Sequence, residues 1–409
     1  MELKDLMSGI GVVIDDNVST ADRDRDDPKT HGDPIDEIVE QIEDEWELAC
    51  YTTSKMPADG TWPGLLRSAS FVLLDWKLWP SGSSELEKDG VHRNIQFLRA
   101  AQDYFVPVLI FTNESEEEVA SNLPDDIYQD RSSQRSFVFV RNKTSLLTDG
   151  SVNFSDIEQW IRQNASVYAL KTWEKVFHAA RRELFGSMYA RSSDWPRVFW
   201  KAYEDDGVDP SSSLTHLIND NLRGRMRMGE FDEAILGGPH PEVPKEELRA
   251  VIGEASFRPQ QTLTEDEIAC GDMFRLSKGK FLLNLLPDCD CVPRNGQAAG
   301  EMKLYCIEGK KMRDSDLEQQ YEAGHFAEKV WEHVIFSVYE GRSVRFDFRR
   351  LRIEEFRSLR EKRIGRLLHP YLTRIQQRFG LYLQRQGLPR IPEDAVRTPV
   401  APSLGEKES

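Results

Sequence analysis

Short runs of β-branched and aromatic residues recur through the first 145 positions of the chain, and each run ends in polar residues. Unbroken apolar runs of this length are typical of parallel strands that are buried on both faces. The four clearest runs end in Val-Val-Ile-Asp15-Asp16, Val-Leu-Leu-Asp75, Leu-Ile-Phe-Thr112 and Val-Phe-Val-Arg-Asn-Lys143.

Segments with helical spacing lie between these runs. Residues 34–45 carry apolar residues on one helix face, namely Ile35, Ile38, Val39 and Ile42. Residues 46–53 are expected to form a further strand, and residues 62–70 a short helix. Strands that alternate with helices predict an α/β fold, here a doubly wound sheet of five parallel strands.

The polar residues that end the strands form a candidate site. In an open parallel sheet the ligand binds outside the carboxyl ends of the strands, so these side chains should lie together. Clustered carboxylates repel one another unless a cation neutralises them, and Mg²⁺ favours oxygen ligands of this kind. A carboxylate beside the ion can accept a phosphoryl group, while a lysine and a threonine can hold its oxygens. The site residues are Asp15, Asp16, Asp75, Thr112 and Lys143.

In their order and strand context these residues resemble the receiver domain of two-component response regulators, over residues 8–165. The resemblance implies a flavodoxin-like fold, Mg²⁺ as cofactor and a histidine kinase as phosphodonor. It implies that Asp75 is the phosphoacceptor and that Thr112 and Lys143 contact the phosphoryl group. The implied metal ligands are Asp15, Asp16, Asp75 and the backbone carbonyl of Lys77.

Some positions depart from the family pattern. Asn113 and Thr144 stand where the family commonly has a small residue and a proline. The resemblance implies that Lys77 and Glu114 occupy positions that tune hydrolysis of the acyl phosphate. The long cationic side chain of Lys77 suggests that it shields the phosphoryl group from attacking water. Three alternatives stay open: ordinary capping residues, a receiver-like domain that is not phosphorylated, and a phosphatase with an aspartyl nucleophile.

Composition separates the chain into an acidic part and a neutral part. The 409 residues have room for two or three domains, and their net charge is −17. Residues 1–165 carry 15 Lys and Arg against 32 Asp and Glu, whereas the rest carries 38 of each. Five cysteines, without a signal segment or a long apolar stretch, predict a cytoplasmic protein with no membrane span.

Four segments follow from the patterning. We expect a receiver at 1–165, a helical connector at 166–240, an α+β output or interaction domain at 241–398, and a disordered tail at 399–409. Within the third segment, residues 262–312 predict a small β barrel or sheet, and residues 322–385 predict helices. Polar insertions are expected at residues 19–33 and 80–89, on the side of the candidate site.

Residues 342–390 form a basic stretch, with 14 Lys and Arg against 4 Asp and Glu. We expect it to form basic C-terminal helices that dock on an acidic surface, bind nucleic acid, or present a solvated face. Cys289 and Cys291 suggest a structural turn, because no second pair of cysteines has the spacing of a zinc site.

No zinc-protease, P-loop or nucleophile-elbow motif occurs, so no enzyme activity beyond self-phosphorylation is expected. A receiver followed by a large region without such motifs resembles the receiver-bearing proteins of bacterial phage-defence phosphorelays of the Detocs type. That resemblance implies a relay or phosphate sink in antiviral defence and a second receiver-bearing effector as partner. A homodimer is a further assembly that we consider. The alternative is a response regulator whose basic C-terminal region binds nucleic acid when phosphorylated.

Overall fold

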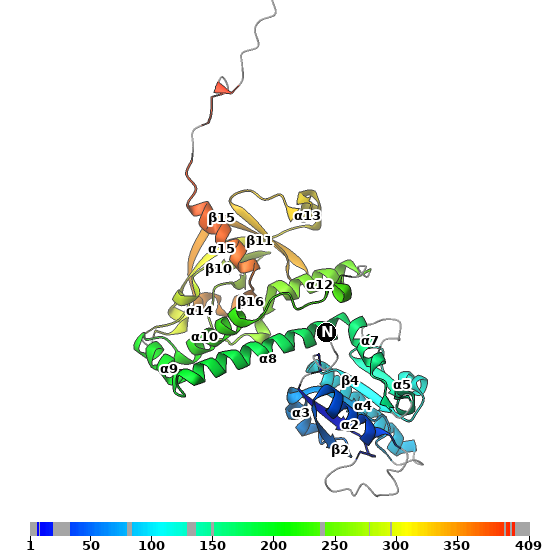
Figure 1. The fold of residues 1–409 in the computed structure, drawn as a ribbon. Helices are drawn as coiled ribbons and strands as arrows, with labels where there is room; N and C mark the ends of the chain where they lie inside the picture. The colour runs from blue at the N-terminus through cyan, green and yellow to red at the C-terminus, as the bar shows by residue number, and fades with distance from the viewer. Residues whose placement is uncertain are drawn as a thin grey trace, which may run out of the picture. The chain divides into compact units, whose positions relative to one another are not determined.

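The structure is a computed structural model of the 409-residue chain, drawn in Figure 1. It describes residues 6–7, 9–18, 33–79, 84–128, 136–148, 151–237, 242–277, 279–294, 297–387, 390–392 and 395–396. The predicted tail at 399–409 and most of the insertion at 19–33 therefore lie outside the described residues. The chain divides into two compact units, Met1–Trp195 with His216–His240 and Pro196–Thr215 with Pro241–Ser409.

The first unit contains a five-stranded, all-parallel sheet with strand order β2-β1-β3-β4-β5. This order is that of flavodoxin-like sheets, so the predicted doubly wound fold is confirmed. The strands are β1 (Ile10–Ile14), β2 (Ala49–Thr53), β3 (Ala69–Leu74), β4 (Val108–Thr112) and β5 (Val138–Asn142).

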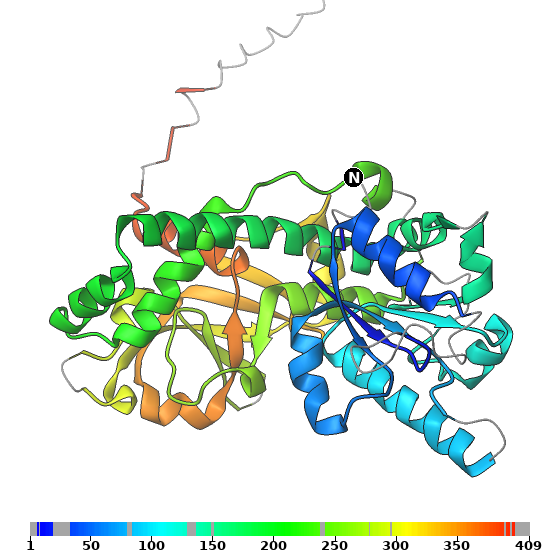
Figure 2. The same cartoon turned by 60° about the horizontal axis from the view of Figure 1, so that its bottom comes forward.

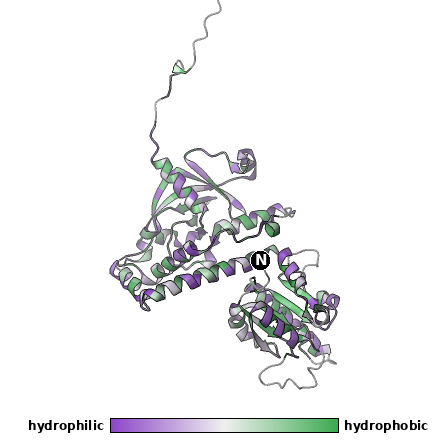
Figure 3. Ribbon diagram, viewed as in Figure 1, coloured by the Kyte–Doolittle hydropathy of each residue, from purple (hydrophilic) through white to green (hydrophobic). Residues whose placement is uncertain are grey.

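Helices cover both faces of this sheet, as Figure 2 shows. Successive strand residues face opposite sides, so Val13 and Leu73 belong to one core while Val12 and Leu74 belong to the other. The first core includes α2 (Ile35–Trp46), α7 (Ser155–Gln163) and the start of α8 (Ala165–Arg191). The second core includes α3 (Trp62–Ser68), α4 (Ser84–Asp103) and α5 (Glu116–Asn122). Strands β1, β3 and β4 are buried on both faces, which explains their apolar sequences (Figure 3), whereas the edge strand β2 is partly exposed.

Residues 165–236, which lie between the two sheets in the sequence, are mostly helical. Asn164 separates α7 from α8, and its side chain accepts a hydrogen bond from the amide of Val167. Lys171, buried on α8, donates to the backbone carbonyl and the hydroxyl of Ser70 at the start of β3. The helices that follow α8 in this segment are α9 (Trp195–Asp205), α10 (Pro210–Arg225) and α11 (Glu233–Leu236). Earlier in the chain, the short elements not yet named are η1 (Asp59–Thr61), α6 (Lys143–Leu146), β6 (Leu147–Thr148) and β7 (Ser151–Val152).

The second unit contains a seven-stranded antiparallel sheet with order β14-β15-β11-β10-β9-β16-β8. Its strands are β8 (Phe257–Pro259), β9 (Asp272–Arg275), β10 (Lys280–Asn284), β11 (Lys303–Lys311), β14 (Glu332–Tyr339), β15 (Arg342–Glu355) and β16 (Arg363–Leu367). The remaining elements are α12 (Lys245–Ser256), η2 (Gln260–Thr262), η3 (Asp288–Asp290), η4 (Ala299–Glu301), α13 (Asp314–Gln320), β12 (Tyr321–Glu322), β13 (His325–Phe326), α14 (Phe356–Leu359), η5 (Arg360–Lys362) and α15 (Tyr371–Leu383). The predicted β sheet followed by a C-terminal helix is confirmed.

The prediction of helices over residues 322–385 is wrong for most of that range. Strands β14, β15 and β16 occupy it, and α15 is its one long helix among the described residues. In β15 every second residue from Val344 to Phe348 faces the core, which is the spacing of a strand and not of a helix. Most of the basic residues of 342–390 therefore lie on or between strands.

The arginines of that stretch pair with carboxylates of their own unit. Arg350 and Arg352 both contact Glu308 on the neighbouring strand β11, and Arg349 contacts Asp347. Deeper in the sheet, Arg363 and Arg366 share the buried carboxylate of Asp272. Carboxylates of the same unit thus balance much of the positive charge of residues 342–390.

Gly11, at the centre of the first sheet, provides a test of this packing. A Cβ at that position would lie 2.7 Å from the Phe71 ring and 3.0 Å from the Cys50 sulfur. We expect Gly11→Ala to destabilise the first unit by about 1–3 kcal/mol in urea denaturation, because overpacking forces neighbours to move. The matched control is Gly64→Ala in α3, where the added methyl meets no atom within 4 Å. Equal stability of the two variants would contradict this packing.

Candidate functional site

The strand ends bring the predicted site residues to one edge of the first sheet. Asp15 directly follows β1, Asp75 directly follows β3, Thr112 ends β4 and Lys143 directly follows β5. The amide of Asp75 donates to the carbonyl of Ile14 at 2.8 Å, which holds the ends of β1 and β3 side by side. The amide of Asp15 donates in turn to Thr53 of β2 at 3.0 Å.

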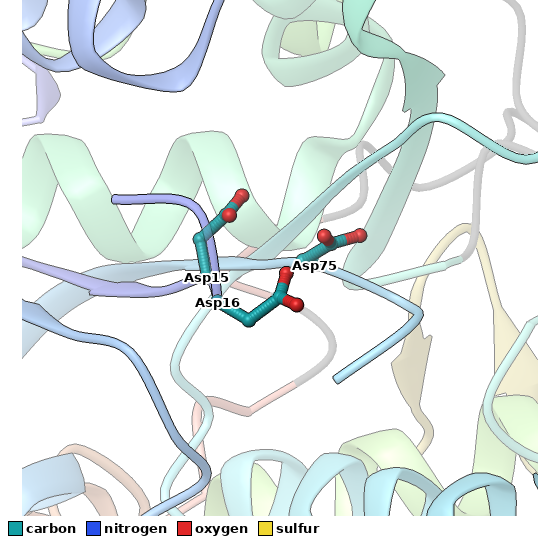
Figure 4. Close-up of side chains that lie close together, drawn as sticks. All are labelled: Asp15, Asp16 and Asp75. Carbon is teal, nitrogen blue, oxygen red and sulfur yellow. The ribbon is translucent and has the colours of Figure 1, made fainter. Parts of the chain in front are cut away.

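Three carboxylates meet at this edge. Asp15, Asp16 and Asp75 each offer an oxygen, and these oxygens lie within 4.8 Å of one another. Figure 4 shows Asp15 and Asp16 at consecutive positions and Asp75 beside them. Within the part of the chain that the structure describes, this is the one group of acidic, histidine or cysteine side chains arranged to hold a metal ion. Its all-oxygen donor set suits a hard divalent cation.

The ammonium of Lys143 lies among these carboxylates. Its nitrogen is 2.7 Å from Asp15, 2.9 Å from Asp33 and 3.3 Å from Asp75, and its side chain is fully buried. Burial alone would lower the pKa of Lys143, but the nearby carboxylates outweigh burial and raise it. Lys143 therefore stays charged and is the cation that the described residues provide to this cluster.

One lysine does not fully compensate for the buried acids. Burial and the charge of Asp75 raise the pKa of Asp15 to about 7, although Lys143 opposes the rise. Burial also raises the pKa of Asp75 to about 6, against the opposing effect of Lys143. The site therefore has a deficit of positive charge near neutral pH, which a bound divalent cation would correct.

A cavity of about 310 Å³ opens beside Asp75. Its volume is roughly ten times the 30 Å³ that a water molecule occupies in the liquid, so a phosphoryl group would fit with waters around it. It is lined by Asp16, Asn17, Asp75, Lys77, Trp79, Thr112, Asn113 and Glu114.

Lys77 and Glu114 form an ion pair at the edge of this cavity. The Lys77 ammonium lies 2.9 Å from the Glu114 carboxylate, and this contact raises the pKa of Lys77. The amide of Lys77 donates to Asp75 at 3.3 Å, and the amide of Glu114 donates to the buried Thr112 hydroxyl at 3.2 Å. These residues therefore border Asp75, while the metal-ligand role of the Lys77 carbonyl stays a prediction.

Sequence reasoning missed a fourth carboxylate, Asp33, and the amide of Asn17 beside it. Asp33 has a side chain that is 7% exposed and contacts Lys143, Asn17 and Asn113. Asp33 ends the predicted polar insertion and accepts a hydrogen bond from the amide of Ile35 at the start of α2. Its sequence position therefore indicates a capping residue, and only the fold places it in the site.

Other predicted features lie apart from this site. The cysteines Cys270, Cys291 and Cys306 are buried and Cys289 is exposed, and none belongs to the metal-binding group found among the described residues.

Of the helices in the described ranges, none has both the length and the apolar character needed to cross a membrane. Comparison of the chain with protein-family models, curated proteins and solved structures finds no match.

Lys143→Met tests the charge balance of the cluster. Removing one partner of a buried ion pair costs about 3–5 kcal/mol, so we expect a loss of that order at pH 8 in urea denaturation of the first unit. The loss should be smaller at pH 5, because Asp15 and Asp75, with pKa values of about 7 and 6, are then protonated and need no cation.

Lys88→Met, at an exposed position on α4, is the matched control and should have little effect at either pH. A loss for Lys143→Met that is the same at pH 5 and pH 8 would contradict the assignment of Lys143 as the counter-charge of these acids.

Proposed function

We propose that this protein is a phosphoacceptor of a two-component phosphorelay. In this proposal a histidine kinase passes a phosphoryl group to Asp75 with the help of Mg²⁺, and the protein then relays the group or stores it. The observation that supports this most is the convergence of Asp15, Asp16, Asp75, Thr112 and Lys143 at the carboxyl edge of a β2-β1-β3-β4-β5 sheet, beside an open cavity.

The proposed step is an in-line transfer. An oxygen of the Asp75 carboxylate attacks the phosphorus of a phosphohistidine, the new P–O bond forms, and the P–N bond breaks with its electron pair left on the histidine nitrogen. Bound Mg²⁺ would neutralise the acidic ligands and attract phosphoryl oxygens. Lys143 lies 3.3 Å from Asp75 and supplies a positive charge to the transferred group.

The Lys77–Glu114 ion pair bears on the fate of the acyl phosphate. It borders the cavity next to Asp75, and in this proposal the two side chains shield one side of a phosphoryl group held there from attacking water. Restricted access to water favours a long-lived modification, as a phosphate sink needs. A role in antiviral defence, and a second receiver-bearing effector as partner, belong to this proposal through the resemblance in organisation.

The ion pairs of the second unit reduce the positive charge that it offers to a nucleic acid. Binding to phosphates depends on lysines and arginines whose charge is available to release counterions. Arg349, Arg350 and Arg352 already lie against Asp347 and Glu308. We therefore do not extend the proposal to nucleic-acid binding.

The direct test is phosphorylation of the purified chain by acetyl phosphate with Mg²⁺. We expect incorporation of a base-labile phosphoryl group that needs Mg²⁺ and is lost in Asp75→Asn, because the amide cannot act as the nucleophile. Quantitative mass spectrometry of the intact protein measures it. Incorporation that survives in Asp75→Asn would remove Asp75 from its proposed role, and no incorporation from either acetyl phosphate or a phosphorylated histidine kinase would refute the proposal.

A second test uses the linkage between protons and Mg²⁺. Because folding raises the pKa values of Asp15 and Asp75 above those of the unfolded chain, their contribution favours folding in acid and is lost as the pH rises through about 6 to 7. We expect Mg²⁺ to raise the thermal stability of the first unit more at pH 8 than at pH 5, by roughly 1–3 kcal/mol.

Asp15→Asn should remove most of this difference, since it takes away one ligand and one titrating group. Calorimetry with Mg²⁺ and with the chelator EDTA measures the effect. A stabilisation that is equal at the two pH values would count against a cation held by these carboxylates.

A further inference from the structure

Three N–H donors converge on one oxygen of Asp33. The Oδ2 atom of Asp33 lies 2.9 Å from the Lys143 ammonium, 2.8 Å from the Asn113 amide and 3.2 Å from the Asn17 amide. These donors come from the chain that follows β5, β4 and β1, so the carboxyl ends of three strands of one sheet bring them to one point. Such a group of donors can bind an anion, and here the anion is the carboxylate of Asp33.

Asp33 does not resemble a further metal ligand. The carboxylates that can hold a cation together are Asp15, Asp16 and Asp75, without Asp33. Its Oδ2 atom already faces three donors, one of them positively charged, and its Oδ1 atom accepts a hydrogen bond from the amide of Ile35 at 3.0 Å.

The Oδ2 atom of Asp33 occupies donors that lie close to Asp75. The Lys143 ammonium contacts both Asp33 and Asp75, and Asn17 and Asn113 line the cavity into which Asp75 opens. A phosphoryl group on Asp75 would therefore find its nearest donors already occupied. Two anions cannot share these donors without strong repulsion.

We propose that Asp33 is an internal competitor of the phosphoryl group, a specificity and regulatory residue whose carboxylate occupies the position of a phosphoryl oxygen. This inference rests on the proposed function of Asp75. Asp33 must withdraw from Lys143, Asn17 and Asn113 before a phosphoryl group can use them. The apparent affinity of the site for such a group is then lowered by the fraction of molecules in which Asp33 is in place.

The experiment compares Asp33→Asn and Asp33→Ser with the unmodified chain. Both variants remove the charge, and both keep a side-chain oxygen that can accept the Ile35 amide at the start of α2. Glu37→Gln is the matched control, because it removes one charge from the exposed side of the same helix turn. Circular dichroism checks that each variant is folded, and the serine variant replaces the asparagine variant if that one does not fold.

Two readings are taken for each protein. One is the initial rate of phosphorylation by acetyl phosphate with Mg²⁺. The other is the affinity, by calorimetry, for fluoroberyllate with Mg²⁺, a phosphoryl analogue that needs no transfer step. If Asp33 fills the site in nine molecules of ten or more, removing it should raise both by about tenfold or more. Glu37→Gln should leave both unchanged.

The outcomes separate this inference from the proposed function. If every protein is phosphorylated on Asp75 at the same rate and binds fluoroberyllate equally, Asp33 is no competitor, although the function of Asp75 stands. If no protein is phosphorylated, the proposed function fails, and fluoroberyllate binding alone decides the role of Asp33. Tighter binding by the Asp33 variants then supports competition, and equal or absent binding overturns it.

Discussion

Lys143 places a fully buried ammonium within 3.3 Å of three carboxylates, and the acidic edge of the first sheet depends on that contact. Without a cation these acids would be buried, close together and uncompensated, which is among the most costly arrangements in a protein interior. One lysine lowers that cost but does not remove it, as the raised pKa values of Asp15 and Asp75 indicate. The remaining deficit gives the site its affinity for a further cation in our account.

The fold explains why these charges meet. Each of the strands β1, β3, β4 and β5 is buried on both faces, so polar side chains are excluded until the strand ends. The strand order sets β1 and β3 side by side, and the hydrogen bond from the Asp75 amide to Ile14 fixes their ends relative to each other. The apolar core thus positions the acids, and the charge of Lys143 reduces the electrostatic repulsion between them.

The strands and five of the site residues could be predicted because their signal is local. An apolar run with Asp15, Asp75, Thr112 or Lys143 at its end is visible in a few consecutive residues. Asp33 could not be placed in this way, since its contacts with Lys143 and Asn113 join positions 110 and 80 residues apart. Its local signal is that of a residue at a helix start, which it also is.

In the second unit the sequence predicted the wrong type of element for residues 342–355. Val344, Phe346 and Phe348 recur at every second position, which is strand spacing, but the arginines clustered at residues 349–352 interrupt this pattern. Glu308, which pairs with Arg350, and Asp272, which pairs with Arg366, lie on other strands, and no local pattern reveals them. Charge balance between strands is a property of the fold and not of the segment.

A crystal structure of the chain with Mg²⁺ and fluoroberyllate would test the central claim most directly. The account predicts a cation held by Asp15, Asp16 and Asp75, a beryllium atom bound to an oxygen of Asp75, and a Lys143 ammonium that contacts fluoride while Asp33 has moved away. An Asp75 carboxylate left unmodified under saturating fluoroberyllate, with no cation beside it and Asp33 still on Lys143, would contradict it.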